Sequence, residues 1–197
     1  MDTRVIFTNQ VEEAIDSAVE SMAPAGVYVL VDTNTAKYVL PRLQTGSKAI
    51  AAAKVLGSDA VWMTDIDESA VRCARENAVR NGVEGVHIVC GDALDAVEAT
   101  GFDWILSNPP YHADFSVAKK FIEKGFNRLK VGGKLVMVVK RELWYRNKLT
   151  AIFGGVKMAE IDGYYIFTAE KRNAAYAPKK QKAPKTPPKE NKKRRKP

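Results

Sequence analysis

The segment Trp104-Ile105-Leu106-Ser107-Asn108-Pro109-Pro110-Tyr111 is predicted to be a short strand that runs into a rigid polar turn. Each proline fixes its own φ, lacks an amide donor and pushes the residue before it out of the helical region. The polar backbone groups of Asn108 and Pro109 are therefore held outward, beside the ring of Tyr111. Such a stiff acceptor pair next to an aromatic face suits a planar group that carries an amine, such as a nucleobase. The alternative is a turn that merely ends the strand.

Strand and helix patterns alternate along the rest of the chain. Apolar runs predict strands at 4–7, 27–31, 60–64, 86–90, 104–107 and 134–140, and helical spacing predicts helices at 10–22, 36–43, 48–56, 69–80, 117–129 and 142–152, with a weak one at 93–98. Two closing strands, 156–161 and 164–169, flank the hairpin signal Asp162-Gly163. The alternation predicts an α/β fold, a Rossmann-like three-layer sandwich whose mostly parallel sheet ends in an antiparallel hairpin.

Three polar residues follow predicted strands: Asp65, Asp92 and Asn108. Ligands of such sheets bind beyond the carboxyl ends of the strands, so this placement favours a site over a plain turn. Two alternatives stay open, because Asp65 and Asp67 could instead cap the helix that begins near Ser69 and Asp92 could be an ordinary turn residue.

Other polar and aromatic residues near this edge are expected to have no role in the site. Lys140 and Arg141 are expected to be solvated charges at a strand end, and Trp144 and Tyr145 to be packing groups of a helix. His112 is expected to be a loop residue.

From about residue 50 to residue 172 the chain resembles the class I S-adenosylmethionine-dependent methyltransferases. Within them it is most similar to the ribosomal RNA small-subunit methyltransferase C type, which methylates a guanine exocyclic amine. The ordered set of segments that carries the resemblance is Val61–Asp67, Ala70–Gly82, Cys90–Ala93, Ser107–Tyr111 and Leu129–Leu135. The resemblance implies S-adenosylmethionine as cofactor and methyl transfer to a nucleobase amine, guanine N2 in ribosomal RNA.

The resemblance also implies a role for each residue of the site. On the cofactor side, Asp65 would accept from the ribose hydroxyls, Ile66 would pack on the adenine and Asp92 would accept from the adenine amine, with Ala93, Asn108 and Gly46 completing the site. On the catalytic side, Asn108 and the carbonyl of Pro109 would hold the target amine, followed by Pro110, and Tyr111 would stack on the base. No metal is implied.

The family's glycine-rich turn is reduced here to Thr45-Gly46, without an apolar strand directly before it. The first 55 residues or so are faintly similar to the start of dehydroquinate synthases, but lack that family's glycine-rich stretch, metal ligands and helical domain. We therefore expect three parts: an atypical segment 1–57 that completes the sheet with its Val27 strand, a methyltransferase body 58–172 and a tail 173–197. The alternatives in function are a catalytically silent RNA-binding protein, or an N-methyltransferase of DNA adenine or protein glutamine.

Composition sets further bounds on the 197 residues. A hydrophobic content of 46% is that of a globular protein, and no apolar run reaches the roughly 18 residues of a membrane helix. Without a signal-peptide pattern, we expect a cytoplasmic protein with Cys73 and Cys90 as reduced core or near-core thiols. Two histidines cannot form a metal site alone.

Charge is concentrated at the C-terminal end. From Lys171 onward there are 12 Lys and Arg against the single acid Glu190, a net charge of +11, whereas residues 1–170 carry −3. The Lys/Pro-rich segment 173–197 lacks the apolar residues needed to order itself. Its cluster Lys192–Lys196 is predicted to be an RNA-tethering arm, since such clusters gain affinity by releasing counterions, and the alternative is a solubilising tail.

Overall fold

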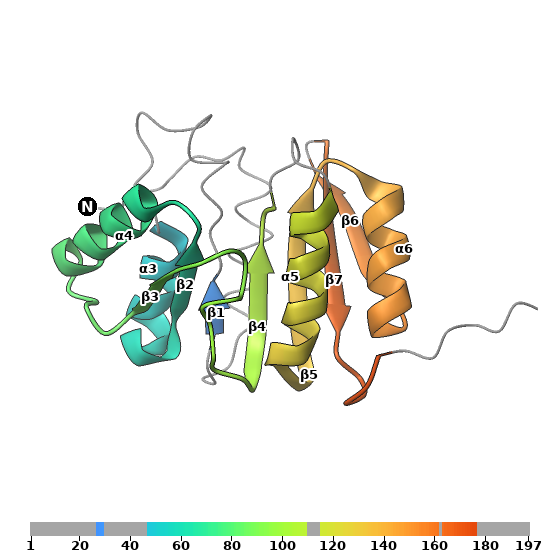
Figure 1. Ribbon diagram of the computed structural model, residues 1–197, viewed down its shortest axis with the longest axis horizontal. Helices are drawn as coiled ribbons and strands as arrows, with labels where there is room; N and C mark the ends of the chain where they lie inside the picture. The colour runs from blue at the N-terminus through green and yellow to red at the C-terminus, as the bar shows by residue number, and fades with distance from the viewer. Residues whose placement is uncertain (1–26, 30–46, 110–114, 162, 177–197) are drawn as a thin grey trace, which may run out of the picture.

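The computed structural model describes residues 27–29, 47–109, 115–161 and 163–176 (Figure 1). In chain order its elements are β1 (Val27–Val29), α3 (Ser47–Leu56), the short 3₁₀ helix η1 (Ser58–Ala60), β2 (Trp62–Asp65), α4 (Glu68–Arg80), β3 (His87–Cys90), β4 (Phe102–Ser107), α5 (Phe115–Arg128), β5 (Leu129–Val139), α6 (Glu142–Phe153), β6 (Lys157–Ile161) and β7 (Tyr164–Glu170). The predicted elements at 4–7, 10–22 and 36–43 lie outside the described residues.

The strands form one layer. Hydrogen bonding gives the order β1-β4-β5-β7-β6 in one sheet and β2-β3 in another, and β1 lies beside β2 (Figure 1). The strands therefore follow each other in space as β3-β2-β1-β4-β5-β7-β6. The pairs β1–β4, β2–β3 and β4–β5 are parallel, whereas β5–β7 and β6–β7 are antiparallel. This confirms the predicted mostly parallel sheet with a closing antiparallel hairpin.

The strand order reverses between β1 and β4. From β1 the chain moves outward through β2 to β3, and then returns to place β4 on the other side of β1. At such a reversal the loops after the two central strands diverge, which opens a crevice at the carboxyl edge of the sheet. The topology thus singles out the ends of β1 and β4 as the place for a ligand.

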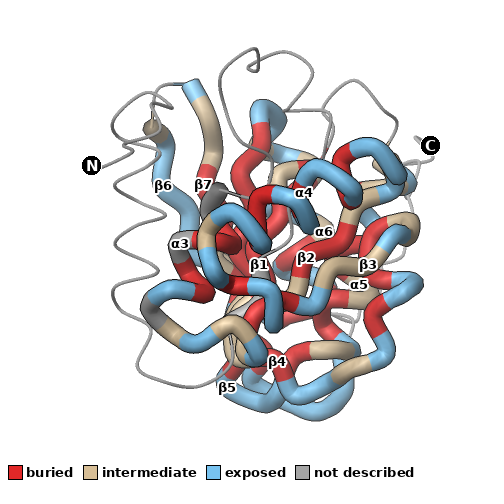
Figure 2. Tube along the Cα trace, turned by 90° about the vertical axis from the view of Figure 1, so that its left-hand side faces the viewer, coloured by how far each residue is buried: buried red, intermediate tan, exposed pale blue. Residues whose placement is uncertain are grey.

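Helices cover both faces of the sheet, and β5 shows how the two faces are divided. Its residues Leu135, Met137 and Val139 pack with the buried residues of α5 and α6, whereas Val136 and Val138 pack with those of α3 and α4. Successive strand residues point to opposite faces, so one apolar strand supplies both cores. Figure 2 shows the buried positions along the strands and on the inner sides of the helices. The three-layer sandwich is confirmed.

Two element predictions were wrong. Residues 93–98 form turns and not a weak helix, because Ala93 has a φ of 54°, in the left-handed region that ends a right-handed helix. The strand predicted from Lys134 begins at Leu129, since Gly132 and Gly133 stay within it across an irregularity in the β4–β5 register. A Cβ at position 133 would come within 2.6 Å of the carbonyl oxygen of Phe102, so only glycine fits there.

The two cysteines are exposed free thiols and not core thiols, which corrects the prediction. The buried stripe of α4 consists of Ala70, Val71, Ala74, Asn77 and Ala78. Cys73 lies off this stripe at helical spacing, and Cys90 ends β3, a strand at the border of the sheet.

Candidate active site at the carboxyl edge of the sheet

The ends of β2 and β3 bring Asp65 and Asp92 to the same edge. In the parallel register Asp65 is paired with Cys90, and the amide of Gly91 donates to the carbonyl oxygen of Asp65 at 2.8 Å. The two strands therefore end level with each other, and the segments that follow them diverge from neighbouring points.

Asp65, Ile66 and Asp67 form the turn from β2 into α4. The Asp65 carboxylate accepts from the Asp67 amide at 2.9 Å, and the Asp67 carboxylate accepts from the Ser69 amide at 2.8 Å. The capping alternative thus holds for Asp67, the N-cap of α4, whereas Asp65 precedes the cap. Ile66 is 63% exposed, so a large apolar side chain stands uncovered next to a carboxylate.

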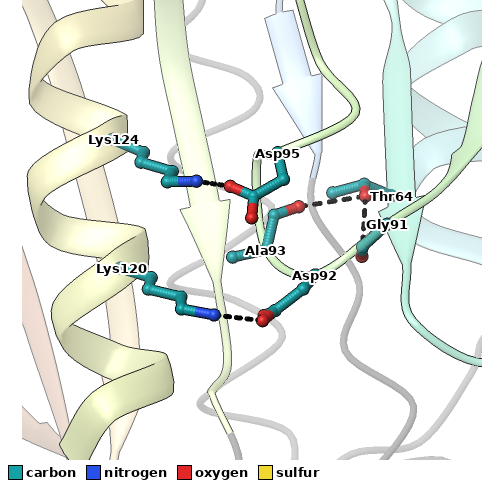
Figure 3. A network of polar contacts seen from close by, with 7 residues as sticks. All are labelled: Thr64, Gly91, Asp92, Ala93, Asp95, Lys120 and Lys124. Atoms are coloured by element: carbon teal, nitrogen blue, oxygen red, sulfur yellow. Dashed lines mark hydrogen bonds and ion pairs between the residues drawn. The ribbon is translucent and has the colours of Figure 1, made fainter.

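The loop that begins with Gly91-Asp92-Ala93 is held in an unusual conformation. A Cβ on Gly91 would meet the Cβ of Ala96 at 2.6 Å, so the loop closes on itself only with glycine there. Ala93 takes a left-handed φ of 54°, and its carbonyl accepts from the buried hydroxyl of Thr64 at 3.0 Å. A side chain of β2 therefore fixes the backbone of the β3–β4 loop, as Figure 3 shows.

Two lysines of α5 also hold this loop. Lys120 pairs with Asp92, and Lys124, one turn further along, pairs with Asp95 (Figure 3). The Lys120 ammonium contacts Oδ2 of Asp92, whose side chain is 35% exposed. Sequence reasoning missed both lysines, although their i, i+4 spacing on a predicted helix was a usable signal.

Asn108 and Pro109 follow β4 directly. Pro109 is buried and Asn108 is half-buried, so the start of the predicted substrate turn is packed into the edge of the sheet. The hydroxyl of the preceding Ser107 is buried and has no hydrogen-bond partner in the part of the chain that the structure describes. Pro110, Tyr111 and His112, and Gly46 on the cofactor side, lie outside the described residues.

Aromatic and cationic side chains also lie where β5 ends and β7 begins and at the first turns of α5 and α6. Phe115 stacks on Trp144 with ring centroids 4.2 Å apart, and the Arg141 guanidinium lies over the Phe115 ring at 5.4 Å. Lys140 lies over the ring of Tyr164 at 4.8 Å. The two cations are exposed, as expected, but both are placed on rings, which the sequence did not indicate.

Tyr145 is a packing group, as predicted. It is 4% exposed and meets the rings of Phe115 and Trp144 edge-on. Burial raises the pKa of its phenol to about 12, and the nearby Arg141 charge opposes part of that rise.

Neither a metal site nor a membrane span is found in the described residues. No group of three or more His, Cys, Asp and Glu side chains lies close enough there to hold a metal ion. No described helix combines the length and the apolar character needed to cross a bilayer.

The chemistry of the edge fits the adenosine part of a nucleoside cofactor. A carboxylate at the end of β2 can accept from ribose hydroxyls, and the exposed Ile66 beside it can cover a flat ring. Asp92 lies on the neighbouring strand end with one oxygen engaged by Lys120, which leaves Oδ1 for an amine. The three side chains thus offer one interaction each for the ribose hydroxyls, the adenine ring and the adenine amine.

The strand order and this edge define the class of fold as that of the Rossmann-like methyltransferases. A solved structure with the same fold is the Thermus thermophilus 16S ribosomal RNA N2 G1207 methyltransferase, determined with AdoMet and guanosine. Its TM-score is 0.63 at 23% identity, and the match covers 86% of this chain and 44% of that chain.

The chain belongs to the methyltransferase small domain family, whose model matches residues 44–168. The ribosomal RNA large subunit methyltransferase G of Pseudomonas putida is 35% identical over 138 residues, which are 66% of this chain and 37% of that protein. The ribosomal RNA small subunit methyltransferase C of Pseudomonas entomophila is 32% identical over 114 residues, 55% of this chain and 34% of that protein. The chain thus spans little more than a third of these relatives.

Proposed function

We propose that this chain binds S-adenosylmethionine and transfers its methyl group to an exocyclic amine of a nucleobase, guanine N2 in ribosomal RNA. The observation that carries the proposal is the meeting of Asp65, Asp92 and Asn108 at one edge of a methyltransferase fold. The family membership and the relatives named as ribosomal RNA methyltransferases support it.

In the proposed complex, the residues after β2 and β3 hold the adenosine. Asp65 accepts from the ribose hydroxyls, Ile66 packs on the adenine, and Asp92 accepts from the adenine amine through the oxygen that Lys120 leaves free. Ala93 places its neighbour Asp92 by its left-handed backbone, which Thr64 holds. Gly46 is proposed to border the methionine part.

Asn108 and Pro109 act on the substrate. The side-chain oxygen of Asn108 and the carbonyl of Pro109 accept the two N–H bonds of the target amine, which aims the nitrogen lone pair into the crevice. Pro110 keeps this turn stiff and Tyr111 stacks on the base. When bound, the cofactor supplies an electrophilic methyl group on a sulfonium and leaves as a neutral thioether. The amine nitrogen forms the new N–C bond and then loses one proton to water.

The proposed partner is ribosomal RNA or a ribosomal subunit in the cytoplasm. A target base within a duplex must leave the stack before its amine reaches Asn108, so the proposed substrate is a flipped or single-stranded guanine. The cationic segment that ends in Lys192–Lys196 is proposed to tether the RNA through its phosphates.

Tritium transfer from labelled S-adenosylmethionine tests the proposal. Ribosomal RNA, unmethylated ribosomal subunits, DNA and protein are assayed in parallel. We expect label in RNA, at guanine N2 after nuclease digestion, and its loss in Asn108→Ala. Label in DNA adenine or protein glutamine, abolished by the same substitution, would instead assign the site to one of those substrates.

A catalytically silent RNA-binding protein is the second candidate function, and the reduced turn Thr45-Gly46 favours it. A full glycine-rich turn lets the backbone approach a ligand closely, which Cβ atoms would block. Titration calorimetry with S-adenosylmethionine separates the two candidates. Micromolar binding supports the enzyme, and an absence of binding together with retained RNA affinity supports the silent protein.

A further inference from the structure

The exposed arginine at the start of α6 has no role in the function proposed above. Arg141 follows β5 and is the N-cap of α6, and its side chain makes no capping hydrogen bond. In the described part of the chain no carboxylate pairs with it, whereas Arg146 on the same helix pairs with Glu142 at 2.6 Å. Among the described residues, Arg141 is thus a cation without an ionic partner at the edge of the proposed active site.

The Arg141 side chain lies over an aromatic ring. Its guanidinium lies 5.4 Å from the centre of the Phe115 ring, and Phe115 stacks on Trp144 at 4.2 Å with 14° between the planes. A cation over a ring face is attracted by the ring, and the contact restricts the rotamers of a long side chain. The contact therefore keeps the fork of N–H donors of Arg141 near the Phe115 ring.

The position of Arg141 relative to Asn108 suggests what this fork binds. In the β4–β5 register Ser107 is paired with Met137, so Asn108 lies one residue beyond the pair and Arg141 lies four residues beyond it. Because β5 ends at Val139, Asn108 and Arg141 both follow the carboxyl ends of neighbouring parallel strands, which lie about 5 Å apart. A base held at Asn108 would therefore carry its own phosphate along the same edge of the sheet, toward Arg141.

The local electrostatics favour an anion at this point, because Glu142, the acid in the first turn of α6, is paired with Arg146. The first amides of α6 lie beside Arg141 without a side-chain cap, and the positive end of the helix dipole adds to the arginine charge. The flat fork of a guanidinium matches two oxygens of a phosphate. The helix end and the arginine therefore both favour a phosphate.

We propose that Arg141, which lies over the Phe115 ring, binds the phosphate of the nucleotide whose base is methylated. The inference rests on the proposed function, because Asn108 holds the base. It assigns this part of the edge to the RNA backbone, where a contact fixes position without reading sequence.

Two small ligands test the phosphate site on the full-length chain. Titration calorimetry with guanosine and with guanosine 3′,5′-bisphosphate, both in the presence of S-adenosylhomocysteine, gives the ratio of the two dissociation constants. We expect the wild-type chain to bind the bisphosphate at least about tenfold more tightly, the size of one charge-assisted contact. Arg141→Met should remove most of this advantage and leave the guanosine constant unchanged. Arg141→Lys should restore only part of it, since lysine lacks the fork.

Arg80→Met is the matched control. Arg80 is an exposed arginine at the end of α4, at the opposite edge of the sheet, and its replacement removes the same charge. A ratio that stays at the wild-type value in Arg141→Met, or that falls equally in Arg80→Met, would overturn the phosphate site. The cationic C-terminal segment is the same in every variant, so it cannot produce a difference between them.

Asn108→Ala separates the phosphate site from the proposed function. It should weaken both ligands by the same factor and keep the ratio. Bisphosphate binding that depends on Arg141, with both constants unaffected by Asn108→Ala, would reject the base site and retain the phosphate site. A wild-type ratio near one would reject the phosphate site alone.

Discussion

Two buried hydroxyls at strand ends differ in whether they have a partner. The Thr64 hydroxyl donates to the Ala93 carbonyl, whereas the Ser107 hydroxyl has no partner among the described residues. We expect Thr64→Val to destabilise the chain by about 1–2 kcal/mol, because the Ala93 carbonyl loses its donor. Ser107→Ala should be neutral or slightly stabilising. Urea unfolding of both variants measures the difference, and equal effects would contradict it.

Tyr145 should make stability depend on pH in the alkaline range. Its pKa rises from 10.0 in the unfolded chain to about 12 in the fold. A raised folded pKa stabilises fully below the unfolded value, and this stability is lost as pH rises from 10 to 12. The loss should approach about 3 kcal/mol, at 1.36 kcal/mol for each pKa unit.

Tyr145→Phe isolates this contribution, because the variant lacks only the phenol hydroxyl of Tyr145. The free energy of unfolding is measured for both proteins at several values between pH 9 and 12. The wild-type chain should lose more than the variant, and parallel curves would show that the phenol ionises normally in the fold.

At the scale of elements, the β3–β4 loop is expected to affect both the stability of the chain and its affinity for the cofactor. Gly91→Ala places a Cβ 2.6 Å from that of Ala96, so the loop must shift. We expect a destabilisation of about 1–3 kcal/mol, the usual range for overpacking. The affinity for S-adenosylhomocysteine should also fall, since Asp92 moves with the loop. Gly82→Ala is the control: Gly82 is a left-handed glycine with nothing within 4 Å of its Cβ position. It should lower stability while leaving the affinity unchanged.

The elements differ in how far the sequence predicts them. Helix α4 was predicted within a residue, because its cap, its apolar stripe and its Asn81-Gly82 end are all local signals. The conformation of the loop after β3 was not predicted, because the left-handed Ala93 is held by Thr64, which is far away in the chain. The placement of Arg141 on Phe115 escaped for the same reason: 26 positions separate them, and no local pattern records a contact made by the fold.

At the scale of the whole molecule, Tyr176 packs against α5, and the cationic C-terminal segment begins directly after it. Its ring meets Phe126 edge-on at 4.8 Å, and its hydroxyl donates to the Glu123 carbonyl at 3.4 Å. From Ala177 onward there are ten Lys and Arg against one Glu, a net charge of +9. A truncation that tests the cationic segment alone must therefore begin after Tyr176, because one after Arg172 also removes a packed ring.

Two truncations separate tethering from folding. Ending the chain at Tyr176 should leave the melting temperature unchanged, whereas ending it at Arg172 should lower stability by about 1 kcal/mol, the worth of one aromatic pair. Both should weaken RNA binding and flatten its salt dependence, by about 0.7 in the log–log slope for each phosphate that the shortened chain no longer neutralises. Fluorescence anisotropy with a single-stranded RNA between 50 and 300 mM KCl measures the slope. An unchanged slope in the chain that ends at Tyr176 would mean that the segment keeps the protein in solution and holds no RNA, and methyl transfer would then depend on the carboxyl edge alone.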